Sequence, residues 1–371
     1  MQRLPKCICS FLLLAVFSQS VSGQEESNNN TVNITTTAVP FLRISPDPRA
    51  GGMGDVGIAV SPDASSVFYN AAKIPFARQK AAIGAIYTPW LKEVADDVYL
   101  AALSGFYQLD ESQSLSASLR YFSMGDLSIV DYNGNKLTTA SPREFALDIA
   151  YSRKLSDRIG VAAALRYINS RLATGNISGV DYKTGNAVAG DISFYYNGLS
   201  EDKKGWTAGV TLSNLGSKIG YTSDADEKDF LPASLGLGAA YAESWDEDNQ
   251  VSFGVDINKL LVPELPATGE GMKAYRDKGV VGSWIDGFGN KAWQAGFGME
   301  YSYKEQLHLR LGYTTRTYEA GNWQSLTAGI GLQFSVAAVN FSYLIPTGSA
   351  VNNNPLRNTV RFGLLFNWDS K

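Results

Sequence analysis

The sequence contains few of the residues from which catalytic centres and covalent cross-links are built. Its two cysteines, Cys7 and Cys9, lie within the first ten residues, and His308 is the only histidine. The chain also lacks any run of about eighteen consecutive apolar residues, which a membrane-spanning helix requires. A formal net charge of −4 gives no indication of a nucleic-acid partner.

The first 23 residues have the pattern of a secretory signal peptide. Arg3 and Lys6 form a basic start, residues 8–17 are apolar, and residues 21–23 are small. Removal of this segment would leave a mature chain without cysteine, and therefore without disulfides or thiol chemistry. Residues 24–39 are polar and low in complexity, and we expect a disordered tail there.

Short runs of alternating apolar and polar residues dominate the chain from residue 80 onward. In residues 113–123, Leu115 and Leu119 fall on one side, whereas Ser116 and Ser118 fall on the other. This period of two predicts strands with one apolar and one polar face. The predicted strands span residues 81–87, 97–108, 113–123, 144–154, 158–169, 188–198, 205–213, 232–243, 250–259, 292–303, 306–315, 323–334, 337–345 and 357–367.

The connections between these strands alternate between long and short. Long ones follow the odd-numbered strands, notably 124–143, 170–187, 214–231 and 260–291. A soluble sandwich or propeller also contains alternating strands but does not sort its loops in this way. We therefore predict an all-β fold, a 14-stranded antiparallel transmembrane β-barrel over residues 80–371. The 19 Tyr, 7 Trp and 17 Phe of the full sequence fit aromatic girdles at the membrane interfaces.

The loop lengths also predict an orientation. Bacterial barrels place their short turns in the periplasm and their long loops outside the cell. We therefore expect a bacterial outer-membrane protein with long extracellular loops and both termini in the periplasm.

Residues 40–79 are predicted to form an N-terminal plug in the lumen. Fourteen strands enclose more space than an eight-stranded barrel, whose interior side chains can fill. This segment precedes the first strand, so it can fold back into that space. Arg43, Asp47, Arg49 and Asp55 are expected to pair with lumen charges. The glycines Gly51, Gly52 and Gly54 are expected to permit its turns, and Asn70 is assigned to the plug as well. A solvated lumen lined by ordinary charges is the alternative.

The sequence offers no convincing catalytic or cofactor site. Residues 51–57 are glycine-rich, but no strand precedes them as a nucleotide loop requires. His308 has no supporting motif for hydrolysis. The acidic clusters at 224–229 and 246–248 lack the spacing of a calcium loop. We therefore expect no enzyme activity, no cofactor and no metal.

Several motifs resemble those of one known family. They are residues 40–44 (PFLRI), 46–54 (PDPRAGGMG), 61–64 (SPDA), 69–73 (YNAAK), 87–91 (YTPWL), 119–123 (LRYFS), 258–263 (NKLLVP) and 354–362 (NPLRNTVRF). Together they resemble the PorV family, FadL-like outer-membrane barrels of the type IX secretion system. The plug departs from the FadL-like pattern at residues 70–72, where Asn-Ala-Ala replaces Asn-Pro-Ala.

The resemblance implies a role in protein secretion. Such barrels act as shuttles that receive cargo, by its C-terminal signal domain, from an SprA-like translocon. They then deliver the cargo to a PorU-like sortase complex at the cell surface. The alternative is a FadL-type transporter of hydrophobic small molecules.

For cargo contact we expect apolar anchors on the outer loops. The predicted residues are Trp90, Leu91, Pro263, Leu265, Trp284, Ile285 and Phe288. For Trp90 and Trp284, a place in the outer aromatic girdle is an equally good interpretation. The second strand, Val98 to Phe106, is apolar on both sides, so either the lumen is partly apolar there or this wall packs against something. Docking against another barrel fits the second interpretation.

Overall fold

The computed structural model describes residues 35–90, 97–130, 133–177, 179–223, 228–266, 269–348 and 357–369. The predicted signal peptide, Leu91 and the acidic residues Asp224, Asp226 and Glu227 lie outside these ranges. None of the helices within them is long and apolar enough to cross a membrane.

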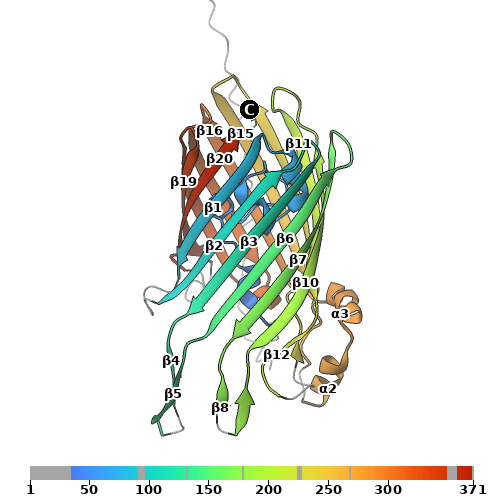
Figure 1. Ribbon diagram of the computed structural model, residues 1–371, viewed down its shortest axis with the longest axis vertical. Helices are drawn as coiled ribbons and strands as arrows, with labels where there is room; N and C mark the ends of the chain where they lie inside the picture. The colour runs from blue at the N-terminus through green and yellow to red at the C-terminus, as the bar shows by residue number, and fades with distance from the viewer. Residues whose placement is uncertain are drawn as a thin grey trace, which may run out of the picture. The chain divides into compact units, whose positions relative to one another are not determined.

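Among the described residues, fourteen antiparallel strands close into a barrel (Figure 1), which confirms the predicted fold. The closure is made by β1, which pairs with β2 on one side and with β20 on the other. In order around the barrel the strands are β1 (Gln79–Pro89), β2 (Val98–Gln108), β3 (Gln113–Met124), β6 (Arg143–Lys154), β7 (Ile159–Arg171), β10 (Gly185–Asn197), β11 (Gly205–Gly216), β14 (Ser234–Ser244), β15 (Asn249–Leu260), β16 (Trp293–Tyr303), β17 (Leu307–Arg316), β18 (Gln324–Gln333), β19 (Ala337–Thr347) and β20 (Val360–Asp369).

The two ends of the barrel differ in their connections. We call them the short-turn end, at the top of Figure 1, and the long-loop end, at the bottom. Strands continue beyond the barrel at the long-loop end as hairpins, and the longest connection contains two helices. These elements are β4 (Leu127–Val130) with β5 (Lys136–Ala140), β8 (Gly175–Ile177) with β9 (Val180–Tyr182), β12 (Ile219–Gly220) with β13 (Lys228–Asp229), α2 (Gly269–Asp277) and α3 (Val280–Asp286). The sequence pattern predicted the long loops but not these elements.

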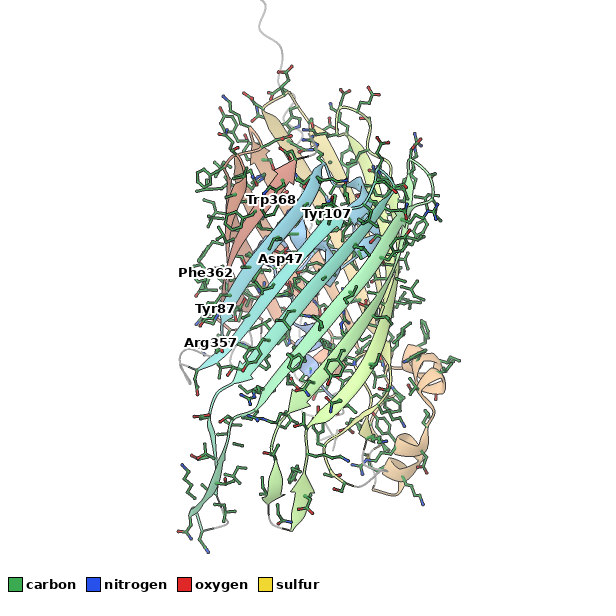
Figure 2. All side chains as sticks on the ribbon, in the orientation of Figure 1. Asp47, Tyr87, Tyr107, Arg357, Phe362 and Trp368 are labelled. Carbon is green, nitrogen blue, oxygen red and sulfur yellow. The ribbon has the colours of Figure 1, made fainter. Side chains whose placement is uncertain are left out.

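The outer face of the barrel is apolar. Figure 2 shows Tyr87 and Phe362 on the outside of β1 and β20, where 47% and 48% of their surfaces are exposed. The charged residues of the strands, such as Asp148 and Arg310, are instead buried on the inner side. A charge on the lipid side would cost about 2–4 kcal/mol near the membrane midplane, which explains this segregation.

Residues 40–76 fold as short helical segments inside the barrel. These are η1 (Pro40–Arg43), α1 (Pro48–Gly52), η2 (Ala64–Phe68) and η3 (Ala71–Phe76). The side chain of Asp47 caps α1 by accepting hydrogen bonds from the backbone N–H groups of Arg49 (3.2 Å) and Ala50 (3.0 Å). Pro48 occupies the first helical position, where its missing N–H costs nothing. We call residues 40–76 the plug.

The inner face of β2 packs against the plug. Val98 and Leu100 are buried in one apolar cluster with Phe41 and Leu42 of the plug and with Phe122 of β3. Contact with the plug therefore explains why this strand is apolar on both sides. The expected docking of another barrel is not needed to account for the pattern.

Candidate functional site

Glycines bring α1 of the plug into contact with the barrel wall. A Cβ on Gly52 would lie 3.0 Å from the Cα of Gly329, and one on Gly54 would lie 2.5 Å from the carbonyl oxygen of Tyr313. Gly54 also has a φ of +71°, which L side chains rarely adopt. The glycines predicted to form turns therefore also permit close approach of backbone to backbone, on both the plug and the wall.

An ion pair between Arg49 and Glu300 joins the plug to the barrel wall. Its guanidinium donates to both carboxylate oxygens of Glu300 on β16, at 3.1 Å and 2.8 Å, and to Asp63 of the plug at 3.0 Å. Glu300 also accepts a hydrogen bond from Arg310 of β17 at 2.6 Å. One wall carboxylate thus balances two arginines, one from the plug and one from the neighbouring strand.

A second charged network lies on the wall formed by β3, β6, β7 and β10. Arg166 donates to Asp148 and, at 2.8 Å, to Asp191. Arg120 lies 3.7 Å from Asp148 and donates to the carbonyl of Leu42 in the plug at 3.2 Å. Low water access strengthens the attraction within such pairs, but the cost of removing the charges from water offsets it, and a charge that loses its partner is costly.

The remaining predicted plug residues have separate places in this packing. Asn70 caps η3 through the backbone N–H of Ala72 (3.0 Å) and donates to the carbonyls of Ile58 (3.1 Å) and Phe194 of β10 (3.0 Å). These bonds fix the segment in which the family's proline is absent. A Cβ on Gly51 would collide with Arg361, which pairs with Asp55 at 3.2 Å.

Arg43 lines a small polar cavity between plug and wall. The cavity has a volume of about 130 Å³, and charged side chains from both the plug and the wall line it. They include Arg43, Asp55, Arg120, Arg166, Asp191, Asp256 and Lys259. This lining suits water or polar groups better than a hydrophobic molecule.

The predicted cargo anchors fall into two groups. Trp90 packs 5.1 Å from the ring of Phe122 and against the cluster that contains Trp323, so it faces the mouth of the lumen. Pro263 is buried, and Leu265 packs onto the small core beneath α2. Trp284 is half-buried, whereas Ile285 and Phe288 are exposed. The structure thus leaves the residues around α3 accessible and places Trp90 and Pro263 in packing positions.

His308 lies directly opposite Ser302 on the neighbouring strand. Nδ1 of His308 and Oγ of Ser302 are 2.7 Å apart. The contact is a cross-strand pair on the inner face of the β16–β17 ladder. No group of three or more His, Cys, Asp or Glu side chains arranged to hold a metal occurs among the described residues.

Solved structures share this barrel architecture at low sequence identity. The TodX deltaS2S3 mutant, a monoaromatic hydrocarbon channel, superposes with a TM-score of 0.56 at 14% identity, covering 87% of this chain and 98% of that one. The toluene transporter TbuX of Ralstonia pickettii gives 0.53 at 10% identity, with coverage of 87% and 98%. A FadL homologue of Pseudomonas aeruginosa gives 0.50 at 10% identity, with coverage of 91% and 99%. At these identities the similarity establishes the fold alone.

Sequence comparison identifies the family. No curated protein sequence matches the chain. However, residues 25–267 match the family described as type IX secretion system protein PorV, which is well over half of the chain. This match confirms the resemblance carried by the plug and strand motifs, and the FadL-like barrel agrees with it. The chain therefore belongs to the PorV family of outer-membrane proteins of the type IX secretion system.

Proposed function

We propose that this chain is a shuttle that binds the C-terminal signal domain of secreted cargo and carries it to the attachment machinery at the cell surface. An SprA-like translocon would supply the cargo, and a PorU-like sortase complex would receive it. In this arrangement the long-loop end faces the outside of the cell, and both termini lie in the periplasm.

One observation carries this proposal. The plug fills the lumen, whereas the long-loop end carries additional hairpins and helices. The plug is held by the Arg49–Glu300 pair and by backbone contact at Gly52 and Gly54. The hairpins and helices at the long-loop end instead expose apolar residues beyond the barrel, such as Leu127 and Leu137 of the β4–β5 hairpin. Exposed apolar groups of this kind are typical of protein-binding surfaces.

The experiment replaces residues 127–140 with a short turn in a strain that lacks the chromosomal copy. Strands β3 and β6 pair along their whole length without this hairpin, so we expect the barrel to assemble. A reduced amount of cargo on the cell surface, with cargo retained in the periplasm, would support the shuttle. Normal display in cells that lack the whole protein would refute it.

A FadL-type channel for hydrophobic molecules is the second candidate. The structural similarity to hydrocarbon channels favours it, whereas the charged lining of the cavity does not. Uptake of a radiolabelled monoaromatic hydrocarbon can be measured in the same deletion strain. Loss of uptake with normal cargo display would favour the channel.

The cargo role of Trp284, Ile285 and Phe288 remains a prediction.

A further inference from the structure

One side of α3 and the turn that follows it is apolar and exposed. Val281, Ile285 and Phe288 expose 62%, 67% and 57% of their surfaces, and Trp284 beside them is half-buried. Their spacing of three to four residues places Val281, Trp284 and Ile285 on one face of α3, and Phe288 follows in the next turn of the chain, Gly287–Gly289. We call these four residues the α3 apolar face.

The opposite side of α3 packs against the barrel rim. Ser283 is buried, and Gly287 lies so close to the chain after β15 that a Cβ there would be 2.3 Å from the carbonyl carbon of Leu261. An ion pair between Lys278 and Asp286, at 2.5 Å, lies on a third side. Because Ser283 and Gly287 face the rim, the α3 apolar face is directed away from the barrel.

The rim at this point is also where the lipid-facing surface of the barrel ends. Trp293, the first residue of β16, follows Phe288 by five positions and exposes 41% of its surface. Ile257 and Phe297 continue the same apolar outer face along β15 and β16. Figure 1 shows α3 beside the barrel wall, at the level where the strands end, rather than across the mouth of the lumen.

We infer that the α3 apolar face inserts into the interface of the membrane leaflet at the long-loop end. An amphipathic helix that lies in the plane of the interface buries its apolar residues at the level of the lipid headgroups and keeps its polar side in water. Tryptophan favours that level, and phenylalanine is common on the apolar face of such helices. Continuity with the lipid-facing surface selects lipid over a protein partner for this face, in place of the cargo contact predicted for Trp284, Ile285 and Phe288. The helix then holds the largest loop against the membrane beside the rim.

The test uses nitroxide labels on single cysteines in the full mature chain, reconstituted in phospholipid nanodiscs. Both native cysteines lie in the predicted signal peptide, so Ile285→Cys and Asp286→Cys give one label each, on the apolar and polar sides of the same turn. Phe297→Cys provides a lipid-exposed reference on the barrel, and Leu137→Cys provides a reference on a loop hairpin. Power saturation then compares the access of each label to oxygen and to a water-soluble nickel chelate.

We expect the label at residue 285 to resemble the one at 297, with oxygen access exceeding nickel access, and the label at 286 to show the reverse. Nickel access at residue 285 equal to that at 137 would overturn the inference. Protection of residue 285 that appears only when a cargo C-terminal domain is added would also overturn it, in favour of a protein contact. Because cargo display is measured separately, failure here leaves the shuttle proposal standing.

Discussion

Arg49 of the plug and Glu300 of β16 form a bidentate ion pair, although 251 positions separate them in the sequence. Nε of Arg49 lies 3.1 Å from Oε2, and Nη2 lies 2.8 Å from Oε1. Glu300 also binds Arg310, so its charge holds two guanidinium groups in a region where only 7% of its side chain is exposed.

The substitution Glu300→Gln should therefore destabilise the folded barrel. It leaves the buried Arg310 without the carboxylate that it binds and Arg49 with Asp63 alone, and loss of one member of a buried pair costs about 3–5 kcal/mol. The free energy of unfolding can be measured by denaturant titration in lipid vesicles. The matched control is Glu305→Gln at the short-turn end, where the exposed pairs with Arg78 and Lys203 should each contribute less than about 1 kcal/mol. Equal losses from the two substitutions would contradict the assigned role of the Arg49–Glu300 pair.

Replacement of the plug glycines should loosen the plug from the wall. In Gly52→Ala the new Cβ meets the backbone of Gly329, and such overpacking costs about 1–3 kcal/mol. Gly54→Ala adds a strained positive φ, at about 1–2 kcal/mol, and should have the larger effect. The measurement is ion conductance in planar bilayers, which should rise as the plug shifts. Gly279→Ala is the control, because its Cβ would have open space; a similar rise there would argue against the close-contact explanation.

Lys218 should hold α2 in place. Its ammonium donates to the carbonyl oxygen of Arg276 at the end of α2 (2.5 Å) and lies 4.4 Å from the ring centroid of Phe230. Partial burial lowers the pKa of Lys218 from its ordinary value of 10.5. Lys218→Met retains the aliphatic chain and removes these contacts, at about 1–2 kcal/mol. We expect roughly ten-fold faster amide exchange over residues 269–277 by mass spectrometry. Lys278→Met, which removes an exposed pair with Asp286, should leave that segment nearly unchanged.

The turn between β14 and β15 should open in acid. The side chain of Asn249 and the backbone N–H groups of Asp248 and Asn249 donate to Asp246, which holds the pKa of its carboxyl below the ordinary value of 3.8. A carboxylate with a lowered pKa in the folded state stabilises the turn above its unfolded pKa, and this stabilisation disappears as the pH falls through the folded value. Amide exchange at residues 248 and 249, corrected for intrinsic rates, should therefore increase below about pH 3.8. In Asp246→Ala, protection should be weak at every pH; protection that persists in that variant would contradict this account.

Several features of the chain could be predicted from sequence because they depend on neighbouring residues. The strands follow from a period-two pattern that lipid on one side and a polar lumen on the other impose on each strand separately. The alternation of loop lengths then fixed the antiparallel order. The glycine-rich segment of the plug is likewise a local signal, whereas the helix cap formed by Asp47 and Pro48 was not predicted.

Other features depend on residues that are distant in sequence, and only the tertiary structure decided them. The pairing of Arg49 with Glu300 and the contact of Gly52 with Gly329 join the plug to strands more than 240 positions away. The sequence left Trp90 open between a loop anchor and a place in the outer aromatic girdle, because nothing near it in sequence indicates that it packs against Phe122 and the Trp323 cluster. Strand β2 is apolar on both sides, which fitted docking against another barrel or a partly apolar lumen, and the structure shows that its inner face packs against the plug. Sequence periodicity shows whether a side chain faces lipid or lumen, but only the packed barrel shows which other side chain meets it there.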